Sequence, residues 1–314
     1  METAYLRTLM ETVAKGSISG AAERVFVTPS AVSRRIKFLE DLFGCPLLDR
    51  SGSTLKPTEA GRLVLEKATE ILTIEQELMK RLRGMSGRRS LSFCCTPAFG
   101  IAYLPGILKN FMSGDEKPNS LNILFGTPDD VVRRLMERIV DIAVLEQCGD
   151  FDRKGYNVYH LPDEEMVFVS APGLGIELGT VHLDVLAHCR IFVRSDGCCS
   201  RILLEGNLRR IGENLDRFGN IITCENLQVI INTVANGGGI AYLSKCVVRE
   251  LLHDGTLRAN NVEGFADTVK RMVVVRETFR PDILSAVFLD AVFSAFNLDT
   301  PPTLSARECP IRLL

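Results

Sequence analysis

The sequence predicts an α/β protein with a small helical N-terminal domain, one long helix and a larger domain of alternating strands and helices. First, 314 residues suit about two domains, and 46% hydrophobic and 24% charged residues are typical of a globular chain. Second, three short helical patterns and two short strand patterns come before residue 58. Third, apolar runs of strand length alternate with helical patterns after residue 90.

Charge divides the chain in the same way. Residues 1–90 hold 15 Lys and Arg against 11 Asp and Glu, whereas residues 91–314 hold 22 against 28. The front part therefore has a net charge of +4 and the remainder one of −6, which gives −2 for the whole chain. This asymmetry favours contact of the front part with an anionic polymer and a different task for the rest.

The first two predicted helices cover residues 3–14 and 18–25. Gly16 ends the first helix, and Ser17 is a suitable N-cap for the second. The small pair Ala21 and Ala22 lets another helix pack closely against the second helix.

A third helix is predicted to start at Thr28 as N-cap, with Pro29 at its first position. One face carries Ser30, Ser33, Arg34 and Lys37, spaced i, i+3, i+4 and i+7. Hydroxyls and cations on one stripe can contact base edges and phosphates in a major groove. Taken alone, the stripe is also compatible with a solvated amphipathic helix.

Two short strands are expected next, at residues 47–48 and 54–56, joined by a turn at residues 49–53. A helix-turn-helix followed by a β-wing results. Arg50 and Lys56 would then reach backbone phosphates beside the groove.

From Gly16 to Gly61 the chain resembles the LysR-type transcriptional regulators in an ordered, gap-free match. The match includes the runs GSISGAAER, VTPSAVSRRI, LLDR and PTEAG, and departs from the family pattern at Leu48, Ser53 and Pro57, which concern the wing. The resemblance implies a DNA-binding head at residues 1–57. The residues expected to contact DNA are Thr28, Pro29, Ser30, Ser33, Arg34, Arg35, Lys37, Arg50 and Lys56.

A long helix capped by Thr58 is predicted to reach about residue 83, followed by a hinge at residues 84–89. Its apolar residues lie near a seven-residue repeat that Glu75 interrupts, and a second chain is the simplest partner for them. The alternative is packing on the chain's own second domain. The resemblance also implies a dimer. The apolar residues are Val64, Ala68, Ile71, Leu78 and Leu82, with Leu65, Leu72 and Met79 beside them.

The sequence after residue 90 predicts α/β subdomains with mainly parallel sheets, arranged as two lobes that the chain crosses twice. The resemblance implies a periplasmic-binding-protein-like effector domain at residues 90–297. Lobe one would hold residues 90–164 and 267–297, lobe two residues 165–266, and residues 298–314 would form a tail. The predicted strands are 91–95, 120–125, 142–146, 166–170, 190–193, 221–223, 240–243 and 272–275, and the predicted helices are 101–111, 129–138, 201–211, 227–236 and 283–296.

Ligands of such sheets bind beyond the carboxyl ends of strands, near helix N-termini. Hydroxyls and free amides there suit a small anion such as a carboxylate. Ordinary capping by Thr96, Thr127 and Ser200 is an alternative, and Arg194 is either a ligand clamp or a solvated charge. The predicted effector-binding residues are Thr96, Pro97, Ala98, Gly126, Thr127, Arg194, Ser195, Cys198, Cys199 and Ser200.

The cysteines offer an alternative function. Cys199 falls where the peroxide-sensing branch of the same family has its reactive cysteine, but Leu208 stands at the position of the resolving one. A thiol-based redox regulator using Cys199 is therefore the second hypothesis. The ten cysteines form no CxxC pair, and without a secretory signal they are expected to be reduced thiols in a cytoplasm.

The sequence thus predicts a cytoplasmic transcriptional regulator of the LysR type rather than an enzyme. It contains no nucleophile elbow, no HExxH run and no phosphate-binding glycine loop. No cofactor, metal or membrane is expected. The expected partners are promoter DNA, a small effector, RNA polymerase and further copies of the chain, as a homodimer or homotetramer.

Overall fold

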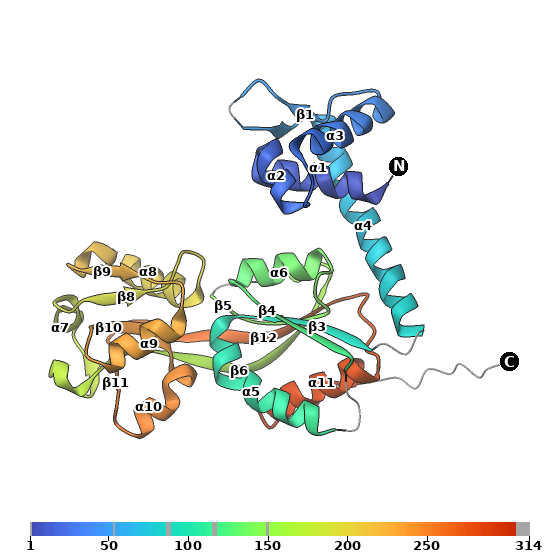
Figure 1. The fold of residues 1–314 in the computed structure, drawn as a ribbon. Coiled ribbons are helices and arrows are strands. Elements are labelled where there is room, and N and C mark those ends of the chain that lie inside the picture. Colours follow the sequence, from blue (N-terminus) through green and yellow to red (C-terminus); the bar gives the residue numbers. More distant parts are fainter. Residues whose placement is uncertain (1, 53, 86–88, 115–117, 149–150, 306–314) are drawn as a thin grey trace. The chain divides into compact units, whose positions relative to one another are not determined.

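A computed structural model describes residues 2–52, 54–85, 89–114, 118–148 and 151–305. It divides into two compact units, residues 1–87 and residues 88–314 (Figure 1). No helix in the described ranges is long and apolar enough to cross a membrane.

The first unit is a three-helix head with a two-stranded wing and the long helix that leaves it. Its elements are α1 (Thr3–Lys15), α2 (Ile18–Arg24), α3 (Pro29–Phe43), β1 (Leu48–Asp49), β2 (Lys56–Pro57) and α4 (Glu59–Met85). The predicted helices and wing are therefore present, with ends that differ by one to three residues.

Local signals explain these boundaries. Gly16 ends α1 in the left-handed region at φ 64°, and the Ser17 side chain accepts the Gly20 N–H at 3.1 Å to begin α2. The buried faces of α1, α2 and α3 then meet in one core, to which α4 adds Ala68 and Leu72. Val64 and Leu65 also pack against this core, so four positions of the predicted α4 stripe belong to the head itself. The side chains of Met79 and Leu82, Ser53 and hinge residues 86–88 lie outside the described residues.

The second unit contains one continuous sheet in the order β4-β3-β5-β12-β6-β10-β8-β9. Strand β11 pairs with β6 beside this order, and β7 pairs with β11. Its strands are β3 (Ser90–Cys95), β4 (Ser120–Phe125), β5 (Ile142–Gln147), β6 (Tyr156–Ser170), β7 (Gly179–Val181), β8 (Ile191–Val193), β9 (Ile221–Thr223), β10 (Ile240–Ser244), β11 (Arg258–Val262) and β12 (Thr268–Arg276). Its α-helices are α5 (Pro97–Ser113), α6 (Pro128–Met136), α7 (Leu183–Ala187), α8 (Cys199–Arg210), α9 (Leu227–Ala235), α10 (Arg249–His253) and α11 (Ile283–Ser294).

The expectation of mainly parallel pairing is wrong at the centre of this sheet. Strands β3, β4 and β5 pair in parallel, but β12 is antiparallel to both β5 and β6, and β6 is antiparallel to β10. Strand β6 pairs with β12 up to Glu165 and with β10 from Met166. This long strand continues through the predicted lobe boundary, so apolar runs alone could not show its first half.

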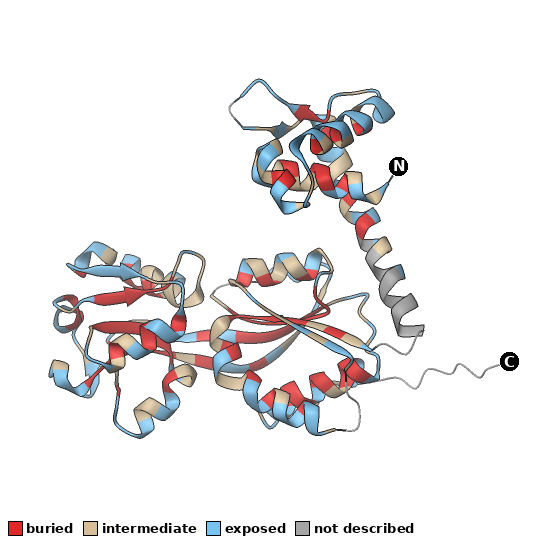
Figure 2. Ribbon diagram, viewed as in Figure 1, coloured by how far each residue is buried: buried red, intermediate tan, exposed pale blue. Residues whose placement is uncertain are grey.

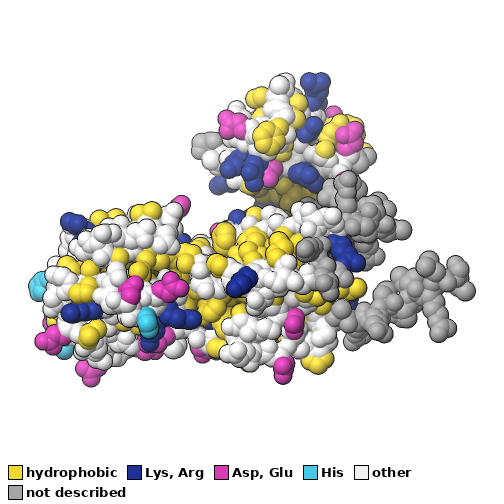
Figure 3. All heavy atoms as spheres, turned by 60° about the horizontal axis from the view of Figure 1, so that its bottom comes forward, with side chains coloured by type: hydrophobic (Ala, Val, Ile, Leu, Met, Phe, Trp, Pro, Cys, Tyr) yellow, Lys and Arg dark blue, Asp and Glu magenta, His cyan; other side chains and the backbone are white. Residues whose placement is uncertain are grey.

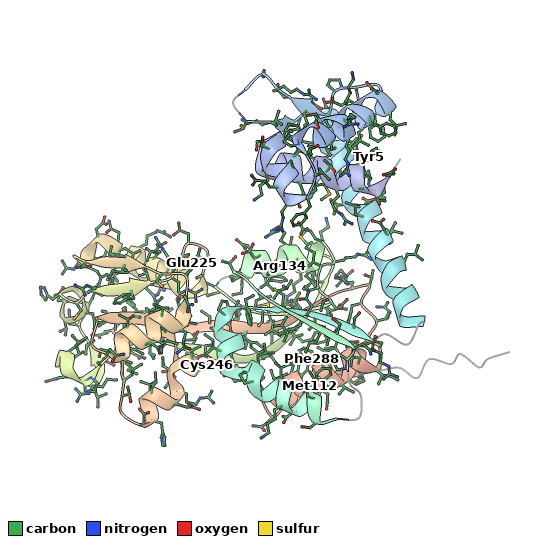
Figure 4. The ribbon with its side chains drawn as sticks, in the orientation of Figure 1. Tyr5, Met112, Arg134, Glu225, Cys246 and Phe288 are labelled. Atoms are coloured by element: carbon green, nitrogen blue, oxygen red, sulfur yellow. The ribbon has the colours of Figure 1, made fainter. Side chains whose placement is uncertain are left out.

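Helices cover both faces of each half of the sheet (Figure 1). In the first half, α5 and α11 pack on one face and α6 on the other, and the strands between them are buried (Figure 2). Phe288 of α11 contacts Phe93 and Phe111 within this layer (Figure 4). In the second half, α7 and α8 pack on one face and α9 on the other.

The segment predicted as a tail begins as packed structure. A short 3₁₀ turn, Pro302–Leu304, buries Leu304 in the core of α5 and α11, and the hydroxyls of Thr303 and Tyr159 lie 2.8 Å apart. Residues 306–314 lie outside the described residues.

Candidate functional site

Helix α3 carries the surface that the sequence assigns to DNA. Thr28 caps it by accepting the Ala31 N–H at 3.3 Å, and Pro29 occupies its first position. Val32, Ile36 and Leu39 are buried against the other helices. Because these three positions fix the rotation of the helix, the opposite stripe is turned toward solvent.

The exposed stripe is the predicted one. Ser30, Ser33, Arg34 and Lys37 are all exposed, as are Thr28 and Pro29 at the helix start. The Ser30 hydroxyl lies 3.0 Å from that of Thr28. Arg34 makes no ion pair within the described part of the chain, so its guanidinium is available for an outside partner. Lys and Arg side chains (dark blue) are interspersed with hydrophobic ones (yellow) on the visible face of this unit (Figure 3).

Arg35 has a partner inside its own domain. Its guanidinium lies 5.7 Å from the centre of the Tyr5 ring, and Nη1 donates to Thr8 Oγ1 at 3.1 Å (Tyr5 is labelled in Figure 4). The side chain thus ties α3 to α1. Its predicted phosphate contact would compete with these interactions.

Glu40 organises the wing, and sequence reasoning missed it. Its Oε1 accepts the N–H groups of Leu47 and Leu48 at 2.9 and 3.3 Å, and its Oε2 pairs with Arg50 at 3.0 Å. Arg50 remains more than half exposed, so the pair orients it without covering it. Lys56, on the opposite strand, is exposed.

The start of α4 is fixed to the base of the wing. Thr58 donates its N–H to Leu47 O at 3.0 Å and its hydroxyl to Pro46 O at 2.8 Å, and its Oγ1 accepts the Gly61 N–H at 2.9 Å. Glu75, which interrupts the apolar repeat, accepts the Thr3 hydroxyl at 2.6 Å and lies 3.5 Å from Arg7. The charge at this position therefore serves contact between α4 and α1.

Beyond the head, α4 presents an apolar row. Ile71, Ile74 and Leu78 have exposed fractions of 37%, 64% and 55%. A spacing of three and four residues places them on one side of the helix. Ile71 and Leu78 belong to the predicted stripe, whereas the sequence analysis did not name Ile74.

In the second unit, a cavity of about 450 Å³, including the part open to solvent, lies where the first turns of α5, α6 and α8 come together. Every predicted effector-binding residue except Ser195 lines it. Sequence reasoning did not name Glu146 at the end of β5 or Ser244 at the end of β10. The lining residues are Thr96, Pro97, Ala98, Gly126, Thr127, Pro128, Glu146, Arg194, Cys198, Cys199, Ser200, Leu227, Leu243 and Ser244.

The capping alternative holds for one of the three hydroxyls. Thr127 accepts the Asp130 N–H at 3.3 Å and so caps α6. Thr96 makes no cap hydrogen bond to α5, because its hydroxyl donates to Glu146 Oε2. Ser200 lies within the first turn of α8, whose N-cap residue Cys198 makes no side-chain cap hydrogen bond.

Arg194 is not a solvated charge. Only 9% of it is exposed, and its Nε has no hydrogen-bond partner. A buried guanidinium N–H without a partner is costly, since transfer from water removes its hydrogen bonds. Of the two alternatives left open by the sequence, the structure excludes the solvated one.

Glu146, which lines the cavity, belongs to a buried charge cluster with Arg271 and Glu164. Arg271 of β12 is 1% exposed; its Nε lies 3.3 Å from Glu146 Oε1, and its Nη2 pairs with Glu164 of β6. Burial raises the pKa of Glu146, although Arg271 and the Thr96 hydroxyl act in the opposite direction. In the sequence, these three residues appear only as charged residues at or near the ends of apolar runs.

The surroundings of Cys198 and Cys199 disfavour their thiolate forms. Cys199 Sγ donates to Glu146 O at 2.7 Å, and Cys148 Sγ to Cys199 O at 3.6 Å. The interaction with Cys148 and burial raise the pKa of Cys199 far above its usual range, and burial raises that of Cys198. Since the thiolate is the reactive form, this environment opposes the redox alternative.

Known proteins resemble this chain along most of its length. The model for bacterial regulatory helix-turn-helix proteins of the lysR family matches residues 4–62, and that for the LysR substrate binding domain matches residues 86–296. The HTH-type transcriptional regulator YeiE of Escherichia coli K12 is 26% identical over 255 residues, 80% of this chain and 83% of YeiE. CbbR of Cereibacter sphaeroides is 28% identical over 268 residues, 80% of this chain and 81% of CbbR.

Solved structures share the fold. The LysR family regulator CbnR aligns with a TM-score of 0.60 at 18% identity, covering 94% of this chain and 99% of CbnR. CbnR complexed with its target DNA aligns with a TM-score of 0.59 at 18% identity, covering 94% of this chain and 100% of CbnR. The outward stripe of α3, the wing, the long α4 and the matches of both domains lead to one conclusion: the chain belongs to the LysR family of DNA-binding transcriptional regulators, in which it pairs a helix-turn-helix head with an effector-binding domain.

Proposed function

We propose that α3 reads promoter DNA through Ser30, Ser33, Arg34 and Lys37. The observation that carries the proposal is the exposure of this stripe, in which Arg34 makes no ion pair with any described residue. Arg34 is the side chain best suited to a guanine, because its guanidinium can donate two parallel hydrogen bonds to one base edge. Thr28, Arg50 and Lys56 would contact phosphates beside it.

Two heads would act together. The exposed row Ile71, Ile74 and Leu78 supports pairing of α4 with a second copy, because an apolar row of this length is stabilised by leaving water. A dimer, or a tetramer built from dimers, would bind a partly symmetric promoter site in the bacterial cytoplasm. The complex of CbnR with its target DNA supports the same use of this fold.

The cavity would hold a small effector. Three helix N-termini and the buried Arg194 support an anionic group as part of it. Effector binding would favour one arrangement of the heads on DNA over another, and so change DNA bending and contact with RNA polymerase.

An Arg34→Ala variant tests the DNA surface. If Arg34 reads a base, specific DNA binding weakens by about 1–3 kcal/mol and specificity at one base pair relaxes. Arg7→Ala is the matched control, since Arg7 pairs with Glu75 at the side of α4. Binding sites are selected from a genomic library, and the binding of each variant to them is measured by fluorescence anisotropy at fixed salt. These measurements give the affinity and the base-pair specificity. Equal affinity and specificity of wild type and Arg34→Ala would reject the proposed role.

A further inference from the structure

We propose that the effector is a small zwitterion of the α-amino-acid type, with its carboxylate at Arg194 and its ammonium at Glu146. The inference rests on the proposed function, because it names the chemical class of ligand for the same cavity. Arg194 and Glu146 both line that cavity, one from the end of β8 and the other from the end of β5.

The carboxylate end follows from unmet donors. Arg194 is nine-tenths buried, and its Nε donates to no atom. Helices α5 and α8 both begin at the cavity without a side-chain cap, so the N–H groups of their first turns also lack that acceptor. A carboxylate has two oxygens that can accept from a guanidinium and from helix N-terminal amides at once.

The ammonium end follows from the balance of buried charge. One guanidinium, Arg271, lies between two buried carboxylates, Glu146 and Glu164. Glu164 also accepts the Cys246 N–H at 2.8 Å, whereas Glu146 receives the Thr96 hydroxyl and a longer contact of 3.3 Å from Arg271. The cluster thus retains excess negative charge, and the carboxylate that borders the cavity is the one less tightly held by Arg271. A ligand cation there would compensate it.

A simple anion fits this cavity less well. The two buried arginines, Arg194 and Arg271, balance the charges of Glu146 and Glu164. A carboxylate bound at Arg194 without an accompanying cation would therefore leave one uncompensated negative charge in a buried site. The lining also has an apolar part, beside hydroxyl and thiol groups, which is formed by Pro97, Ala98, Pro128, Leu227 and Leu243. Together these features suit a short aliphatic amino acid, whose two charges match the two ends and whose side chain meets the wall.

Isothermal titration calorimetry of the full chain tests the proposal with matched sets of compounds. L-Alanine, L-valine and L-leucine are each compared with the acid that lacks the ammonium (propionate, isovalerate, isocaproate). They are also compared with the amine that lacks the carboxylate (ethylamine, isobutylamine, isoamylamine). At least one amino acid should bind about 10- to 100-fold more tightly than either of its halves, since each half leaves one buried charge unpaired.

Two variants assign the ends. Glu146→Gln should weaken binding of the amino acid about 10- to 100-fold while the matching acid binds as well as before or better. Arg194→Gln should weaken both. Glu177→Gln and Arg209→Gln are exposed controls in the same unit and should leave every affinity unchanged. The comparison of whole ligand with half ligand uses the wild type alone, so it stands even if a variant fails to fold.

Equal binding of L-valine and isovalerate, the absence of binding by all three amino acids, or an unchanged affinity for amino acid in folded Glu146→Gln would each overturn the zwitterion. If L-valine and isovalerate bind equally, and isovalerate also alters DNA binding, the effector is an acid and the proposed function still stands. Failure of the proposed function is detected separately, by loss of the difference between Arg34→Ala and wild type on DNA.

Discussion

Gly61, in the first turns of α4, is the position where one added methyl group should most clearly disturb the head. A Cβ built there would lie 2.0 Å from the carbonyl oxygen of Leu47, 3.0 Å from its carbonyl carbon and 3.3 Å from Pro57 Cβ. The nearest atom belongs to the backbone, so rotation of a side chain cannot relieve the contact. The head must therefore move apart where α4 meets the wing.

The magnitude of Gly61→Ala follows from three contributions. Overpacking costs about 1–3 kcal/mol, and weakening the hydrogen bond from Thr58 N–H to Leu47 O costs about 1 kcal/mol. Replacing glycine by alanine inside a helix recovers about 1 kcal/mol. We expect a net loss of about 1–3 kcal/mol in the unfolding free energy of the first unit, a large part of what a domain of this size has.

Hydrogen exchange followed by mass spectrometry measures this loss unit by unit. A loss of about 2 kcal/mol corresponds to roughly 30-fold faster exchange of the slowest amides in α1 to α3, with no change in the second unit. Gly106→Ala is the matched control: Gly106 also lies inside a helix, α5, but a Cβ there meets no atom within 4 Å. That variant should stabilise the second unit by about 0.5–1 kcal/mol and so slow the exchange of its amides. If Gly61→Ala left exchange in the head unchanged or slower, the reasoning from the backbone contact would be refuted.

Three further predictions concern strain, assembly and pH. Phe26 is 93% exposed, and its backbone has a φ of 54°, in the left-handed region that asparagine tolerates better than phenylalanine. Phe26→Asn should therefore stabilise the head by about 0.5–1 kcal/mol, measured as slower hydrogen exchange. Faster exchange would contradict this prediction. Ile74→Glu places a charge in the exposed row of α4 and should lower the mass found by light scattering to that of a monomer. The control Glu66→Gln should leave this mass unchanged. A dimer that persists in Ile74→Glu would argue against this row as the interface. Burial raises the pKa of Glu146 above its ordinary value of 4.5, so the folded state binds this proton more tightly than the unfolded state. The stability that this proton contributes is fully present below pH 4.5 and is lost as the pH rises through the pKa of the folded state. The unfolding free energy of wild type, relative to that of Glu146→Gln, should therefore fall over this pH range. Urea unfolding followed by circular dichroism measures the difference, and a difference that stays constant with pH would contradict the assignment.

The orientation of α3 and the elements of the head could be predicted because their signals are local. Thr28 caps a helix whose first residue is the next one, Pro29, and Val32, Ile36 and Leu39 repeat at the helical period. These interactions join residues at most a few positions apart, so the amino-acid order displays them directly. The strand ends around the cavity could be predicted for the same reason, since a polar residue that ends an apolar run is visible in the sequence.

Charged side chains whose partners lie far along the chain could not be placed in this way. Arg35 and Thr8 are 27 positions apart, and Arg271 and Glu146 are 125 apart. Each of these arginines has the same local pattern as a solvated one, and Arg194 was left open for that reason. The antiparallel course of β6 beside β12 was hidden as well, because strand direction depends on the path of the connection.

The sequence alone therefore determined the family, the two-domain order, the outward stripe of α3 and the set of strand ends that border the cavity. The tertiary structure decided which cations are buried, that Glu40 holds the wing, and that Glu146 and Arg194 border one cavity. The physical reason is that periodicity and capping act between neighbours in the chain, whereas desolvation and the pairing of charges depend on everything that folding brings around a side chain.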